Sequence, residues 1–134
     1  MFSLQSIVYL VIAVILSMSI HETAHGLVSY WMGDPTAKLE GRLSLNPFKH
    51  VDWLGLVCLL ICGFGWAKPV PIDARYYKDA KTGIIWTSFA GPVANFLLSF
   101  ICIFLFFSYN LFSSGLYFPK FLCFYLIHWY QFFL

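Results

Sequence analysis

The sequence has 134 residues, of which 60% are hydrophobic, 21% are aromatic and only 10% are charged. Because soluble domains usually carry about 25% charged residues, this composition excludes an ordinary cytosolic protein and a disordered chain. The formal net charge of +2 is too small for a surface that binds polyanions, so we expect no nucleic-acid partner. The composition indicates one domain, residues 1–134, embedded in the lipid bilayer.

The first predicted element is a transmembrane helix over residues 4–31. Residues 1–21 carry no charged side chain, and about 20 apolar residues in a helix span a bilayer core of about 30 Å. A signal peptide would begin with a basic segment and end at a small-residue cleavage site, and neither is clear in this sequence. We therefore expect the helix to be retained.

A polar excursion follows over residues 33–81, which hold every charged residue except Glu22 and Lys120. Because positive residues stay in the cytoplasm, we predict that this loop is cytoplasmic and that the N-terminus faces outward. Within it, residues 37–46 alternate between apolar and polar, which is typical of a strand. We expect a small β-hairpin-like element, which either lies on the membrane surface or pairs through its edge with an extended peptide.

Three further apolar segments are present, and the first of them lies inside the polar excursion. Residues 53–67 are too few to cross the bilayer comfortably and predict a re-entrant or shallow helix, with a short full span as the alternative. Residues 82–108 predict a second crossing, a turn is expected near 109–115, and 116–134 predict a partial last helix. The predicted fold is therefore an all-α membrane protein of about three transmembrane helices, multi-pass in a bacterial cell membrane.

The first helix ends in a motif that suggests chemistry, His21-Glu22-Thr23-Ala24-His25. On a helix, positions i and i+4 share a face, so both imidazoles could bind one Zn²⁺ ion while Glu22 activates water. Glu22 is also the only acidic residue in an apolar segment, where an unpaired carboxylate is costly. The alternative is a buried, hydrogen-bonded structural cluster without metal.

Three linked motifs resemble the site-2 protease family of intramembrane zinc metalloproteases, in its compact bacterial form without a PDZ insertion. They are HETAHGLVSYWMGDPTAKLEGRLSLNPFKHVDWLG, GFGWAKPVPID and FAGPVANFLLS, in this order within about residues 8–105. The resemblance implies that His21 and His25 bind zinc, that Glu22 is catalytic, and that Asn95 lies near the catalytic centre. The Asn95 amide could bind a substrate carbonyl or an oxyanion, or it could simply join two helices.

A third zinc ligand is missing from this pattern. The family takes it from an Asp in a Leu-Asp-Gly-type motif on a later helix, and this sequence has no such motif. His128, His50 and Asp52 are weak substitutes. We therefore expect a C-terminally shortened family member, whose third ligand would come from a missing segment or from a partner chain.

Two functions remain at this point. The first is a zinc endopeptidase that cleaves transmembrane or membrane-proximal protein substrates, with its activity in doubt without a third ligand. The second is a non-catalytic membrane scaffold or substrate-binding protein, such as a truncated pseudoenzyme.

Overall fold

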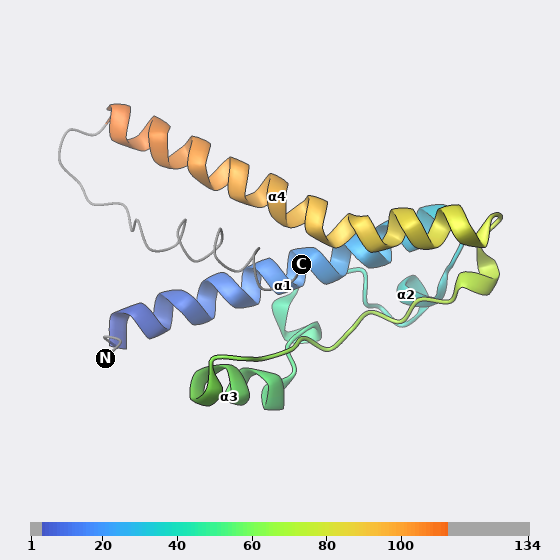
Figure 1. The fold of residues 1–134 in the computed structure, drawn as a ribbon, viewed down its shortest axis with the longest axis horizontal. Helices are drawn as coiled ribbons and strands as arrows, with labels where there is room; N and C mark the ends of the chain where they lie inside the picture. The colour runs from blue at the N-terminus through green and yellow to red at the C-terminus, as the bar shows by residue number, and fades with distance from the viewer. Residues whose placement is uncertain (1–3, 113–134) are drawn as a thin grey trace.

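The computed structural model describes residues 4–112 and shows a mostly helical chain built on two long helices (Figure 1). Helix α1 spans Leu4–Met32 and helix α4 spans Ala80–Phe112. Their packing is the most extensive contact between elements. In Figure 1 they lie together where α1 ends and α4 begins, and they diverge toward the start of α1 and the end of α4.

Both long helices are long and apolar enough to cross a membrane, over Ile7–Met32 and Ala80–Tyr109. This confirms that the chain is mostly helical, and its two long apolar helices are compatible with a membrane protein. The expectation of about three transmembrane helices is not supported, because the described residues contain two such helices. The predicted last segment, 116–134, lies outside the described residues.

Helix α1 ends at Met32 because Gly33 takes a left-handed conformation, with φ of 115°. The Gly33 N–H donates to the Tyr30 carbonyl at 3.1 Å, and the Asp34 N–H donates to the Ser29 carbonyl at 3.1 Å. This pair of bonds is the Schellman arrangement that satisfies the last carbonyls of a helix. It turns the chain back toward α1 directly after the helix.

The predicted β-hairpin over residues 37–46 is wrong. Thr36–Leu39 form a single helical turn, α2, and no β-strand occurs within residues 4–112, where the one β-bridge joins Val51 and Ala67. The turn forms because the Asp34 carboxylate accepts the Thr36 N–H at 2.9 Å, and Ala37 is then buried beside Gly26. One helical turn is too short for its own periodicity to show in the sequence, so the period-two pattern misled the prediction.

The short helix α3 covers Trp53–Cys62, which is shorter than the predicted 53–67. The Asp52 side chain caps its start by accepting the N–H groups of Leu54 and Gly55, and Gly63 ends it with φ of 74°. Ten residues rise about 15 Å, half of a bilayer core. Whether α3 is re-entrant stays a prediction.

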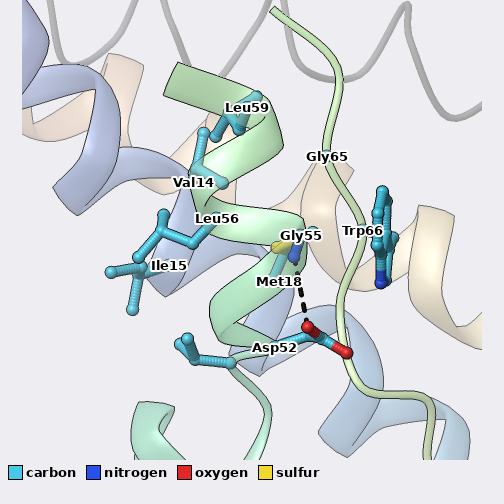
Figure 2. A pocket seen from close by; sticks show the side chains of 10 residues that line it. Val14, Ile15, Met18, Asp52, Gly55, Leu56, Leu59, Gly65 and Trp66 are labelled. Atoms are coloured by element: carbon cyan, nitrogen blue, oxygen red, sulfur yellow. Dashed lines mark hydrogen bonds between the residues drawn. The ribbon is translucent and has the colours of Figure 1, made fainter. Parts of the chain in front are cut away.

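Helix α3 packs on α1 through a small apolar core of Val14, Met18 and Leu59. Figure 2 shows this contact, with the Asp52 cap and the extended chain at Gly65 and Trp66 running beside the helix. The cavity between them, about 10 Å³, has room for about one water molecule. The cavity is therefore too small for a ligand, and the contact between α3 and α1 serves packing.

Two short 3₁₀ turns complete the described chain: η1 at Pro47–Lys49 and η2 at Ala74–Tyr76. Helix α4 then starts after Asp79, whose carboxylate accepts the Lys81 N–H at 3.1 Å and the Thr82 hydroxyl at 2.6 Å. It extends beyond the predicted 82–108 to Phe112, and no Gly or Pro occurs in its stretch from residue 93 to residue 112.

Candidate metal centre

The two histidines of the HExxH motif meet on the face of α1 that packs against α4. His21 is buried and His25 is half-buried, and their ring centroids lie 4.6 Å apart. Their Nε2 atoms are 3.0 Å apart. Two nitrogens at 2.0–2.1 Å from one tetrahedral ion would lie about 3.3–3.4 Å apart, so a small adjustment would allow both to bind one ion.

A backbone carbonyl of α4 determines the proton position on His25. His25 Nδ1 lies 2.6 Å from the Thr87 carbonyl oxygen. A carbonyl can only accept a hydrogen bond, so Nδ1 carries the proton and a neutral ring presents an unprotonated Nε2. This is the arrangement that orients most metal-binding histidines.

Asn95 contacts the outer nitrogen of the other histidine. Its Nδ2 lies 3.1 Å from His21 Nδ1, and its Oδ1 is buried without a hydrogen-bond partner in the described part of the chain. In this orientation Asn95 donates to Nδ1, and His21 Nε2–H can donate to His25. Rotating the amide by 180° would exchange its two atoms, so that Oδ1 could accept a proton from Nδ1 and leave Nε2 unprotonated.

The Asn95 contact therefore fits both interpretations drawn from the sequence. One amide orientation gives a directed, metal-free hydrogen-bonded cluster, and the other gives two imidazoles ready to bind an ion.

Gly91 allows the histidines to lie this close to α4. A Cβ atom at this position would overlap His25 Nε2 and both Cε1 and Nε2 of His21. Pro92, inside the helix, removes the N–H that would otherwise bind the Ser88 carbonyl. Gly91 thus gives α4 a surface without side-chain bulk directly opposite the motif.

Glu22 lies in the same site but is held by a different segment. Its Oε2 accepts the Val70 N–H at 3.0 Å, and the extended chain before Val70 is held by Arg42, which donates to the carbonyls of Lys68 and Pro69 at 3.1 and 3.0 Å. Glu22 therefore has a fixed orientation beside the two imidazoles.

An open cleft of about 370 Å³ lies over these three side chains. Its lining is otherwise mostly apolar and comes from the extended chain and from α4: Pro69, Val70, Ile72, Tyr77, Ile84, Thr87 and Ser88. A cleft of this size could admit a short stretch of extended peptide, with the histidines and Glu22 among the residues that line it.

The weak substitutes for a third ligand do not join the histidines. Asp52 caps α3, and His50 is fully buried with its Nε2 bonded to the Ser44 carbonyl at 2.7 Å. His128 lies outside the described residues. Between residues 4 and 112, no group of three His, Cys, Asp or Glu side chains could hold a metal ion. The donor set fits zinc as two imidazoles beside a carboxylate, and it is one ligand short of a usual catalytic site.

Sequence reasoning did not identify the backbone groups that orient the site, the Thr87 carbonyl and the Val70 N–H. Main-chain atoms carry no residue signature, so no motif could have named them. The available signals were indirect: Gly91 before Pro92 on α4, and two prolines flanking Val70 that favour an extended chain.

The sequence is 50% identical over 97 residues to a Bacillus subtilis protein named "Putative zinc metalloprotease YwhC". The match covers 72% of this chain and 44% of that protein, so the chain spans less than half of the relative's length. No family model matches the chain, and no solved structure matches it. The chain is therefore related by sequence, over most of its own length, to a bacterial protein named as a zinc metalloprotease.

Proposed function

We propose that this chain forms the zinc-binding part of an intramembrane metalloprotease of the site-2 type. The observation that carries the proposal is the convergence of His21 Nε2 and His25 Nε2 to 3.0 Å, on a helix long enough to cross a membrane. The relative's name supports the zinc and the protease chemistry. The site-2 assignment rests on the resemblance of the three motifs.

In this proposal His21 and His25 hold the ion, and Glu22 is the general base. Zinc, when bound, would supply Lewis acidity toward a peptide carbonyl and toward water. The Val70 N–H bond fixes one oxygen of Glu22, which leaves the carboxylate placed to take a proton from water within the cleft. Asn95 has two candidate roles, orienting His21 and binding a substrate oxygen.

The proposed substrate is a transmembrane or membrane-proximal segment of another protein. The outer surface of α4 is rich in exposed apolar side chains, including Trp86, Phe89, Phe96, Phe100 and Phe104, which suits a helix facing lipid. A helical substrate must unwind locally, because its carbonyls are otherwise bonded within the helix. We propose a cytoplasmic side for residues 33–81, from the positions of Lys and Arg.

The missing third ligand supports a second candidate function. Two imidazoles hold zinc less firmly than the three protein ligands of usual catalytic sites, and the described residues supply no further one. Either a partner chain or further chain of this protein completes the site, or the scaffold binds substrates without cleaving them. The metal content of the purified protein separates these alternatives.

The test measures zinc per chain by elemental analysis after the purified full chain is loaded with zinc and passed through a desalting column. About one zinc per chain is expected for wild type and for Glu22→Gln, and much less for His21→Ala and His25→Ala. Glu40→Gln is the matched control, because Glu40 is exposed and outside the cleft. Wild type without zinc, or unchanged zinc in both histidine variants, would overturn the proposal.

A further inference from the structure

A line of buried polar side chains joins the end of α1 to the start of α4. Asp34, Ser29, Tyr77 and Thr87 are each at most 8% exposed. Ser29 Oγ lies 2.8 Å from Asp34 Oδ2 and 2.7 Å from Tyr77 Oη, and Tyr77 Oη lies 3.1 Å from Thr87 Oγ1. Of these four residues, only Thr87 has a role in the site described above, and it acts there through its main-chain carbonyl and not through its side chain.

The proton positions along this line follow from the number of donors that each group has. Ser29 donates its single hydroxyl proton to Asp34, so Ser29 Oγ must accept from Tyr77. Tyr77 has then used its only proton, so Tyr77 Oη accepts from Thr87. The result is a directed chain in which three hydroxyl groups point toward one carboxylate.

Asp34 is a firm end for this chain because its carboxylate is saturated with donors. Besides Ser29, it accepts the Asp73 N–H at 2.8 Å and both the N–H and the hydroxyl of Thr36. An ionised carboxylate has about four acceptor positions, and all four are used. Burial alone raises the pKa of Asp34, but the hydrogen bonds from Asp73, Thr36 and Ser29 outweigh it and lower the pKa below its usual value.

The opposite end of the chain meets the candidate metal centre through one residue. Thr87 offers its hydroxyl to Tyr77 and its carbonyl to His25 Nδ1 at 2.6 Å. The Tyr77 ring also packs directly against Gly83, where a Cβ atom would overlap it. Tyr77 is thus held against the first turns of α4, and Thr87 lies one turn further along the helix.

We propose that Asp34, acting through Ser29 and Tyr77, is a positioning residue for the metal centre. The line of hydrogen-bonded hydroxyl groups that ends on Asp34 fixes the part of α4 whose Thr87 carbonyl orients His25. The inference rests on the proposed zinc site and adds the hydroxyl chain that prepares one of its ligands. Ser29, Tyr77 and Thr87 are positioning residues in the same sense, because their hydroxyl groups bond to one another and to Asp34; Tyr77 and Thr87 also line the cleft.

The experiment compares four single variants of the full chain with wild type. Thr87→Val and Tyr77→Phe each remove one hydroxyl of the chain with little change in shape. Thr87→Ser keeps the hydroxyl and serves as the conservative rescue. Thr36→Val is the matched control, because it removes a hydroxyl bond to Asp34 that lies off the path to Thr87.

Two readouts apply to every variant. Cobalt(II) is the metal probe: its visible absorption reports ligand geometry, and competition with zinc gives the relative affinity. Histidine ¹⁵N chemical shifts of the metal-free protein report the fraction of His25 that carries its proton on Nδ1. Melting of the metal-free protein records any general loss of stability separately.

If the line of hydroxyl groups positions His25, Thr87→Val and Tyr77→Phe should each lower zinc affinity about tenfold, as loss of the outer partners of a metal ligand commonly does. Both variants should also shift the cobalt spectrum. Both should also reduce the Nδ1–H fraction of His25, whereas Thr87→Ser and Thr36→Val match wild type. Equal behaviour of all four variants in affinity and in His25 protonation would overturn the inference. Failure of wild type to bind cobalt would overturn the proposed zinc function instead, and the ¹⁵N measurement would still decide whether the chain orients His25.

Discussion

Gly91→Ala is the substitution that most sharply separates the packing of α4 from the geometry of the histidines. A Cβ atom at position 91 would stand 2.5 Å from His21 Nε2, whereas ordinary contacts begin at 3.4 Å. The ring or the helix must therefore retreat by roughly 1 Å, which exceeds the tolerance of about 0.2 Å typical of metal–ligand distances. The perturbation is a single methyl group at the point where the two imidazoles meet α4.

The added methyl group has two opposing effects on folding stability, a gain in helix propensity and a cost of overpacking, but it has only an unfavourable effect on zinc binding. Alanine favours a helix over glycine by about 1 kcal/mol, and overpacking costs about 1–3 kcal/mol, so the net change in stability should be a loss of about 0–2 kcal/mol. Zinc binding has no compensating gain. We expect its affinity to fall at least tenfold, which is about 1.4 kcal/mol.

The assay is a zinc competition titration beside a thermal melt of the metal-free protein. Ala94→Gly is the matched control, because it makes the reverse exchange on the same helix without adding atoms. It should lower the melting temperature slightly and leave zinc affinity unchanged. Gly91→Ala with wild-type zinc affinity would refute the reasoning, since the histidines could not then lie where a methyl group at 91 would overlap them.

Three further predictions concern the base, a helix cap and acid stability. Glu22→Gln should abolish cleavage of a membrane-embedded substrate by the complete enzyme while zinc per chain stays unchanged; retained cleavage would remove Glu22 from the mechanism. Asp52→Ala should destabilise the protein by about 1 kcal/mol through loss of the α3 cap, with unchanged zinc affinity, and a change in affinity would show that Asp52 acts at the metal centre. The folded-state pKa of Asp34 is lowered, so its ionised form contributes stability above its unfolded pKa of about 4. This contribution is lost as pH falls through the lower folded pKa. Melting temperatures measured between pH 6 and 3 should therefore fall more steeply in wild type than in Asp34→Asn, and parallel curves would contradict this.

The long helices and the meeting of the two histidines were predictable because their signals are strong and local. An apolar run without charge directly predicts the length of a helix, and a four-residue spacing between histidines directly predicts that they share one helix face. The position of Asn95 next to His21 could be expected only from the resemblance to a family, since nothing local to Asn95 indicates which helix it will face.

The elements that sequence analysis misjudged depend on contacts between distant residues. The one-turn helix α2 forms where the Asp34 carboxylate accepts the Thr36 N–H, and Asp34 is held in turn by the Asp73 N–H, which lies far along the chain. The end of α3 depends on Gly63, and the chain beyond it runs extended because Gly65 packs against the backbone of Gly55. Such pairings carry no period in the sequence, so the alternation at 37–46 gave the wrong element.

X-ray absorption at the zinc edge tests the central claim most directly, because it counts the imidazole nitrogens around the ion. Zinc-loaded wild type should show imidazole scattering from two histidines at about 2.0–2.1 Å, and the smaller amount of zinc that remains on His25→Ala should show about half of that scattering per ion. Zinc bound without imidazole scattering, or with scattering unchanged in His25→Ala, would contradict the account of His21 and His25 as its ligands.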